Sequence, residues 1–68
     1  MNVIEVHITF RVIEEAQIWT IVCEHGKLDY DWRIMIINEK GDSYNFKHFG
    51  PLNNDTIIGL LEENLIYL

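Results

Sequence analysis

Strict alternation of apolar and polar residues near the start of the chain is the feature that most limits its fold. The apolar positions between residues 3 and 13 are Ile4, Val6, Ile8, Phe10 and Val12. The positions between them are Glu5, His7, Thr9 and Arg11. Because successive side chains of a strand point to opposite faces, this pattern predicts a strand with one buried face.

Three further segments are predicted to be strands: residues 16–25, 29–37 and 43–49. Residues 16–25 are open to a second interpretation, a helix that starts at Glu14. Ile18, Thr20 and Val22 are β-branched and lose rotamer freedom in a helix, so a strand is favoured.

The turns between these segments predict a register for each pair of strands. A turn at Glu14-Glu15 pairs Phe10 with Trp19, Ile8 with Ile21, and Val6 with Cys23. A turn around Gly26-Lys27 pairs Trp19 with Ile34, Ile21 with Trp32, and Cys23 with Tyr30. A three-residue loop with Gly41 in the left-handed position pairs Ile36 with Tyr44, Ile34 with Phe46, and Trp32 with His48. In all three pairs of strands the apolar residues fall mainly on one face, so we expect an antiparallel meander.

The segment after Pro51 is predicted to form a helix over about residues 54–67, with capping residues at Asn53-Asn54-Asp55. Its apolar residues cover about half of the circumference, so it should lie across the apolar face of the sheet. Asn64 falls within that apolar arc and needs a hydrogen-bond partner. The predicted fold is therefore a single α+β domain over residues 1–68: a four-stranded antiparallel β-meander with one C-terminal α-helix on one face.

Composition limits the partners. The 68 residues carry a net charge of −6 and only five basic side chains, which are scattered along the chain, whereas nucleic acids and anionic membranes require a Lys/Arg footprint. Cys23 is the single cysteine, so an internal disulfide is excluded and a reducing compartment is expected. The first residues do not resemble a secretory signal, and no apolar run is long enough to span a membrane, so the cytoplasm is the expected location.

The outer face of the predicted sheet carries an apolar patch, which in the predicted register places Ile18 beside Met35 and Ala16 beside Ile37. Its residues are Ile13, Ala16, Ile18, Val22, Met35 and Ile37. Three interpretations compete: exposed apolar side chains without a role, a surface for another protein, or a homodimer interface. The homodimer is favoured, because a chain this short buries a marginal core.

The other end of that face is acidic, with a candidate partner surface at Glu5, Glu24, Asp29 and Asp31. Paired carboxylates can serve acid–base chemistry or bind a divalent ion, so the alternative function is a small metal- or carboxylate-dependent enzyme that uses Asp29, Asp31, Glu24 and His7. A solvated edge, or one that docks a basic protein, is favoured because a four-stranded meander offers no evident cleft.

Two further chemical hypotheses are weak. A zinc site at Cys23, His25, His7 and His48 is disfavoured, because these side chains do not converge on one face. Cys23 as a nucleophile lacks an electropositive setting and is expected to be a core residue.

The expected function is therefore that of a non-enzymatic, homodimeric, acidic protein-interaction module that binds a basic protein surface and needs no cofactor or metal. A specific version is an inhibitor that mimics the charge of nucleic acid, by analogy with anti-defence proteins of phages and mobile elements.

Overall fold

The computed structural model describes residues 7–14, 16–28 and 30–68, excluding the side chain of His7. The strands are β1 (His7–Glu14), β2 (Gln17–His25), β3 (Asp31–Ile37) and β4 (Ser43–Phe49). They are followed by the helix α1 (Asn54–Asn64) and a 3₁₀ turn η1 (Leu65–Tyr67). The strands form one antiparallel sheet in the order β1-β2-β3-β4, which confirms the predicted α+β meander. Predicted strand residues 3–6 and 29 lie outside the described residues.

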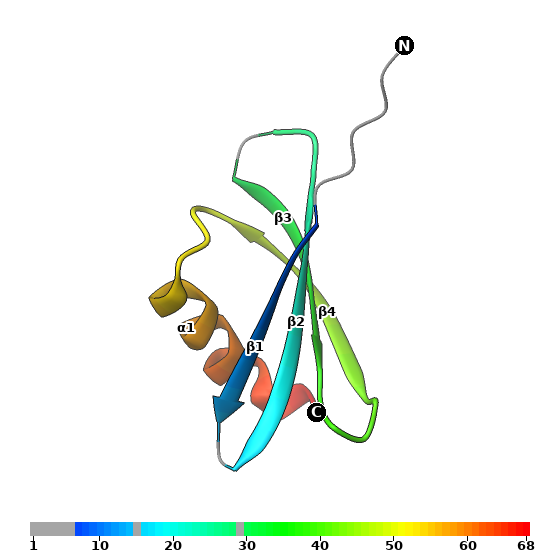
Figure 1. Ribbon diagram of the computed structural model, residues 1–68. Helices are drawn as coiled ribbons and strands as arrows, with labels where there is room; N and C mark the ends of the chain where they lie inside the picture. The colour runs from blue at the N-terminus through cyan, green and yellow to red at the C-terminus, as the bar shows by residue number, and fades with distance from the viewer. Residues whose placement is uncertain (1–6, 15, 29) are drawn as a thin grey trace.

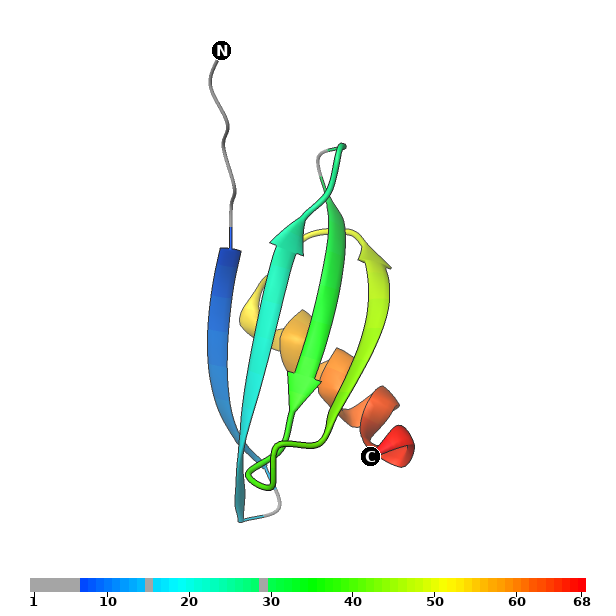
Figure 2. The same cartoon turned by 90° about the vertical axis from the view of Figure 1, so that its right-hand side faces the viewer.

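The molecule has two layers, the sheet and the helix. Helix α1 lies on one side of the sheet in Figure 1, and in Figure 2 it crosses diagonally behind the strands. Ile57 and Leu61 of α1 are buried in a core cluster with sheet residues. Those sheet residues are Trp19, Ile21, Cys23, Trp32, Ile34 and Ile36. All of them share one alternation parity within their strands, so this is the apolar face that the sequence predicts.

The hairpin between β3 and β4 has the predicted register, with Ile36 opposite Tyr44, Ile34 opposite Phe46 and Trp32 opposite His48. Gly41 adopts a φ of +92°, the left-handed conformation that this loop requires. The Asn38 carboxamide oxygen accepts hydrogen bonds from the backbone N–H groups of Lys40 (3.0 Å) and Asp42 (2.9 Å). Local hydrogen bonds thus determine where this turn forms.

The predicted register of the first hairpin is wrong by two residues. Phe10 lies opposite Ile21 and Val12 opposite Trp19, because the strands meet at the pair Glu14–Gln17. The two-residue connection therefore lies one residue further along than Glu14-Glu15, and it includes Ala16 at a φ of +60°. Moving a turn by one residue changes the register by two, so each side chain stays on its predicted face.

The predicted register of the second hairpin is also wrong, by four residues. Ile21 lies opposite Ile36, Cys23 opposite Ile34 and His25 opposite Trp32. The connection is longer than a tight turn at Gly26-Lys27: Gly26 N–H donates to the Asp31 carbonyl (2.6 Å) and Asp31 N–H to the Leu28 carbonyl (3.1 Å). Tyr30, expected opposite Cys23, lies in this loop at a φ of +64° and is exposed.

Both ends of α1 use asparagine side chains. The Asn53 side chain accepts a hydrogen bond from Thr56 N–H (2.8 Å), which is an N-cap. The Asn64 carboxamide donates to the Leu60 carbonyl (2.8 Å), which supplies the partner that its position in the apolar arc requires. The predicted helix over 54–67 is thus an α-helix to Asn64 and a 3₁₀ turn beyond it. There, Tyr67 stacks on Tyr44 of β4 with ring centroids 4.6 Å apart.

Gly59 and Gly41 form a matched pair, because a Cβ added at either would meet no atom within 4 Å. Alanine is favoured over glycine inside a helix by about 1 kcal/mol, so Gly59→Ala should raise the free energy of unfolding. The left-handed conformation costs an L-residue about 1–2 kcal/mol, so Gly41→Ala should lower it. Urea denaturation measures both changes, and changes of the same sign would contradict the backbone explanation.

Candidate interaction surface

The face of the sheet opposite α1 is the candidate functional site, and we call it the open face. No element of the described part of the chain covers it (Figures 1 and 2). Alternation along the paired strands assigns the residues that belong to it. They are Thr9, Arg11 and Ile13 of β1, Ile18, Thr20, Val22 and Glu24 of β2, Asp31, Arg33, Met35 and Ile37 of β3, and Ser43, Asn45, Lys47 and Phe49 of β4.

An apolar strip runs along the open face. Val22 lies directly opposite Met35, and Thr20 opposite Ile37. At the end of the sheet next to the β1–β2 turn, Ile13 pairs with Ile18, and these two side chains are 77% and 45% exposed. The strip is therefore continuous from the middle of the sheet to the β1–β2 turn.

Five members of the predicted apolar patch lie in this strip, but two predicted neighbour relations are wrong. Ile18 does not lie beside Met35; its backbone N–H donates to the Glu39 carboxylate (2.7 Å), beyond the end of β3. Ala16 does not lie beside Ile37, because it belongs to the β1–β2 turn. Both errors follow from the shifted registers.

The half of the open face nearest the β2–β3 loop carries charged side chains. Arg33 Nη2 lies 3.0 Å from Glu24 Oε1, and Lys47 lies opposite Arg33 on the next strand. These three side chains, together with Val22, Met35 and Asn45, line a shallow hollow of about 450 Å³. A charged row thus borders the apolar strip.

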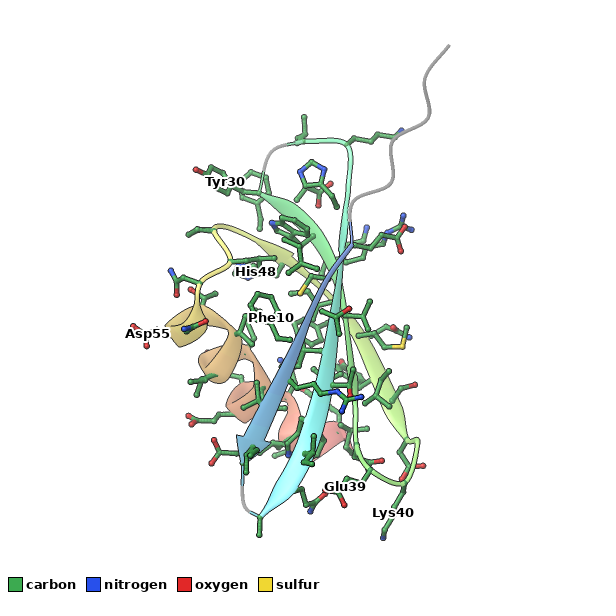
Figure 3. All side chains as sticks on the ribbon, viewed as in Figure 1. Phe10, Tyr30, Glu39, Lys40, His48 and Asp55 are labelled. Atoms are coloured by element: carbon green, nitrogen blue, oxygen red, sulfur yellow. The ribbon has the colours of Figure 1, made fainter. Side chains whose placement is uncertain are left out.

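The folded chain gathers most of its cations on the open face. Arg11, Arg33 and Lys47 are three of the five basic residues, whereas the sequence interpretation regarded the five as scattered. Lys27 lies in the β2–β3 loop. Lys40, which is labelled in Figure 3, lies in the β3–β4 turn. Alternation could have revealed this grouping, because all three cations have the outward parity of their predicted strands.

The predicted acidic surface is described only in part, because Glu5 and Asp29 lie outside the described residues. Glu24 is paired with Arg33. Asp31 begins β3, and its carboxylate lies so close to Gly26 that a Cβ there would collide with it. Among the described residues, no group of three or more His, Cys, Asp or Glu side chains is arranged to hold a metal ion.

Cys23 is a core residue, as predicted, although its strand neighbours are Ile8 and Ile34. Burial raises the pKa of its thiol from 9.0 to about 11, which opposes formation of the nucleophilic thiolate. The two histidines with described side chains contact other groups: His25 packs edge-on against Trp32, with ring centroids 4.8 Å apart. His48 Nε2 lies 3.4 Å from the Pro51 carbonyl oxygen.

Burial of the Cys23 thiol predicts that it reacts slowly in the folded protein. Folded protein at about pH 8 should react with an aromatic disulfide reagent at least about a hundredfold more slowly than protein in concentrated guanidinium chloride, because the group is both enclosed and protonated. Absorbance of the released aromatic thiolate measures the rate.

The same pKa difference has a consequence for stability. The unfolded chain loses this proton near pH 9.0 and the folded chain near 11. Between those values the unfolded state binds fewer protons, so this group lowers the free energy of unfolding as the pH rises. In the experiment with the aromatic disulfide reagent, equal reaction rates of the folded and the unfolded protein would contradict the buried position of Cys23.

Comparison of the chain with models of protein families, with curated proteins and with solved structures gave no significant match. Within the described residues, no helix is long and apolar enough to cross a membrane.

Proposed function

We propose that this chain is a non-enzymatic protein-interaction module that forms a homodimer through the open face and binds a basic protein surface. The observation that carries the proposal is the apolar strip of Val22, Met35, Ile37, Ile13 and Ile18, which no described element covers. Uncovered strips of this kind mark sites of protein association.

The size of the chain supports self-association. Domains of about 60–70 residues bury a smaller fraction of their surface than larger domains do, and they usually gain stability from disulfides, metals or a second subunit. Cys23 is the single cysteine and lies in the core, so an internal disulfide is excluded. Burial of the strip in a dimer would stabilise a fold whose own core is small.

The charge supports a basic partner. Asp55, Glu62 and Glu63 are exposed on α1, and residues 50–68 contain no Lys or Arg. Asp55 projects away from the sheet in Figure 3. The proposed acidic contact therefore extends to the helix side, because Glu24 is already compensated by Arg33. An inhibitor that mimics nucleic-acid charge is the specific form of this proposal.

The dimer is tested by Val22→Lys in the middle of the strip. We expect wild-type protein at tens of micromolar to sediment at about twice the 8.1 kDa chain mass. The variant should sediment as a monomer, because the interface would have to bury an unpaired charge.

Ile66→Lys is the matched control, because Ile66 is 81% exposed in η1, away from the open face. It should leave the dimer intact. A monomeric wild type, or a dimer unaffected by Val22→Lys, would refute dimerisation through this face.

The basic-partner proposal is tested by fluorescence anisotropy with a labelled oligo-lysine peptide as the probe. We expect binding at low ionic strength and its loss at about 0.5 M salt, where charges are screened. A variant with Asp55→Asn, Glu62→Gln and Glu63→Gln should bind at least about tenfold more weakly than Glu24→Gln.

Equal binding of the oligo-lysine peptide by both variants would contradict the helix-side contact.

Calorimetry distinguishes the interaction module from the alternative function, a small metal- or carboxylate-dependent enzyme. Micromolar affinity for a divalent ion that is lost in Asp31→Ala would favour the enzyme.

A further inference from the structure

We propose that two copies stack their open faces about a twofold axis that runs parallel to the strands, between β2 and β3. This inference rests on the proposed dimer and adds its geometry. In such a dimer β2 of one copy lies over β3 of the second copy, and the reverse, because a twofold interface is self-complementary.

The direction of the axis decides which residues meet. An axis parallel to the strands keeps every row of cross-strand neighbours over the same row of the second copy. An axis across the strands reverses the order of the rows. The charges and shapes on the open face therefore discriminate between the two arrangements.

The apolar rows suit the parallel axis. Val22 and Met35 are direct partners within one sheet, so each would lie over the other in the second copy. Thr20 would lie over Ile37 by the same rule. Met35 is unbranched and adapts to irregular gaps, and the shallow hollow of about 450 Å³ beside Val22 provides space for it.

The charged row supplies the complementarity. Glu24 and Arg33 are paired at 3.0 Å within one copy, and their side chains are 47% and 63% exposed. Stacking would place Glu24 of each copy over Arg33 of the other, so that four charges alternate in sign. Packed sheets lie about 10 Å apart, a gap that an Arg side chain from one sheet and a Glu side chain from the other can bridge.

The axis across the strands lacks this match. Placed midway along the strip, it would put Arg33 over Glu39 but Glu24 over the apolar Ile18. It would thus pair only one of the two charges, whereas the parallel axis pairs both. The parallel axis also separates the remaining cations. Arg11 of β1 would lie over Ser43 of β4, so the two Arg11 side chains would occupy opposite flanks of the dimer.

The experiment uses the charge reversals Glu24→Arg and Arg33→Glu in the full chain. Each variant alone would bring four like charges together, so we expect it to dimerise at least about tenfold more weakly than wild type. An equimolar mixture should form a heterodimer, because the two arginines of the Glu24→Arg chain then face the two glutamates of the Arg33→Glu chain. Native mass spectrometry resolves the three dimers by mass, and sedimentation gives their affinities.

The mixture distinguishes ion pairs between two copies from the Glu24–Arg33 ion pair within one copy. Mixing the two variants can restore pairs between copies, but it cannot restore the pair within either chain. Lys40→Glu in the β3–β4 turn is the matched control, with the same charge change as Arg33→Glu and no expected effect. Circular dichroism of each variant verifies folding, and an unfolded variant is replaced by Glu24→Lys or Arg33→Asp.

Recovery of dimer in the mixture alone supports the parallel axis. If wild type is a dimer and the single variants dimerise equally well, or the mixture stays monomeric, the parallel axis is wrong while the dimer stands. If wild type is a monomer, the proposed dimer itself fails.

Discussion

The contact between α1 and one face of the sheet is the interaction on which the rest of this structure depends. Ile57 and Leu61 complete a core with six sheet residues, and Asn53 caps the helix where it begins. A four-stranded sheet has two faces, and the described chain has one helix to cover them. The open face is therefore a direct consequence of how the core is built.

The same two-layer arrangement sorts the charges. Strand alternation directs Arg11, Arg33 and Lys47 to the open face, whereas Asp55, Glu62 and Glu63 are exposed on α1. A chain with a net charge of −6 repels a second copy of itself. Cations on the open face reduce that repulsion where two copies would meet, and acidic residues remain available to a basic partner on the other side.

The accuracy of the predicted registers followed the local chemistry of each turn. The β3–β4 hairpin was predicted residue by residue, because Gly41 and the Asn38 side chain mark its loop. The Glu14-Glu15 turn was misplaced by one residue, because alternation is equally satisfied by registers that differ by two. The β2–β3 loop was predicted too short, because its hydrogen bonds join Gly26 to Asp31 across residues that carry no strong turn signal.

The candidate surface was predicted to a similar extent. Its apolar members were identified by parity, yet Ile18 was assigned the wrong neighbour and the three cations were treated as scattered. Membership of a face follows from the position of a residue within its own strand. Neighbours across the sheet follow from register, and therefore from turns that the apolar pattern does not specify.

The sequence by itself determined the elements, their order, the two faces of the sheet and the buried state of Cys23, because these depend on local periodicity and on turn and cap residues. Tertiary structure decided which side chains stand together: Val22 with Met35, Glu24 with Arg33, and the cations on one surface. Those relations depend on backbone hydrogen bonds between segments that only the folded chain brings into contact.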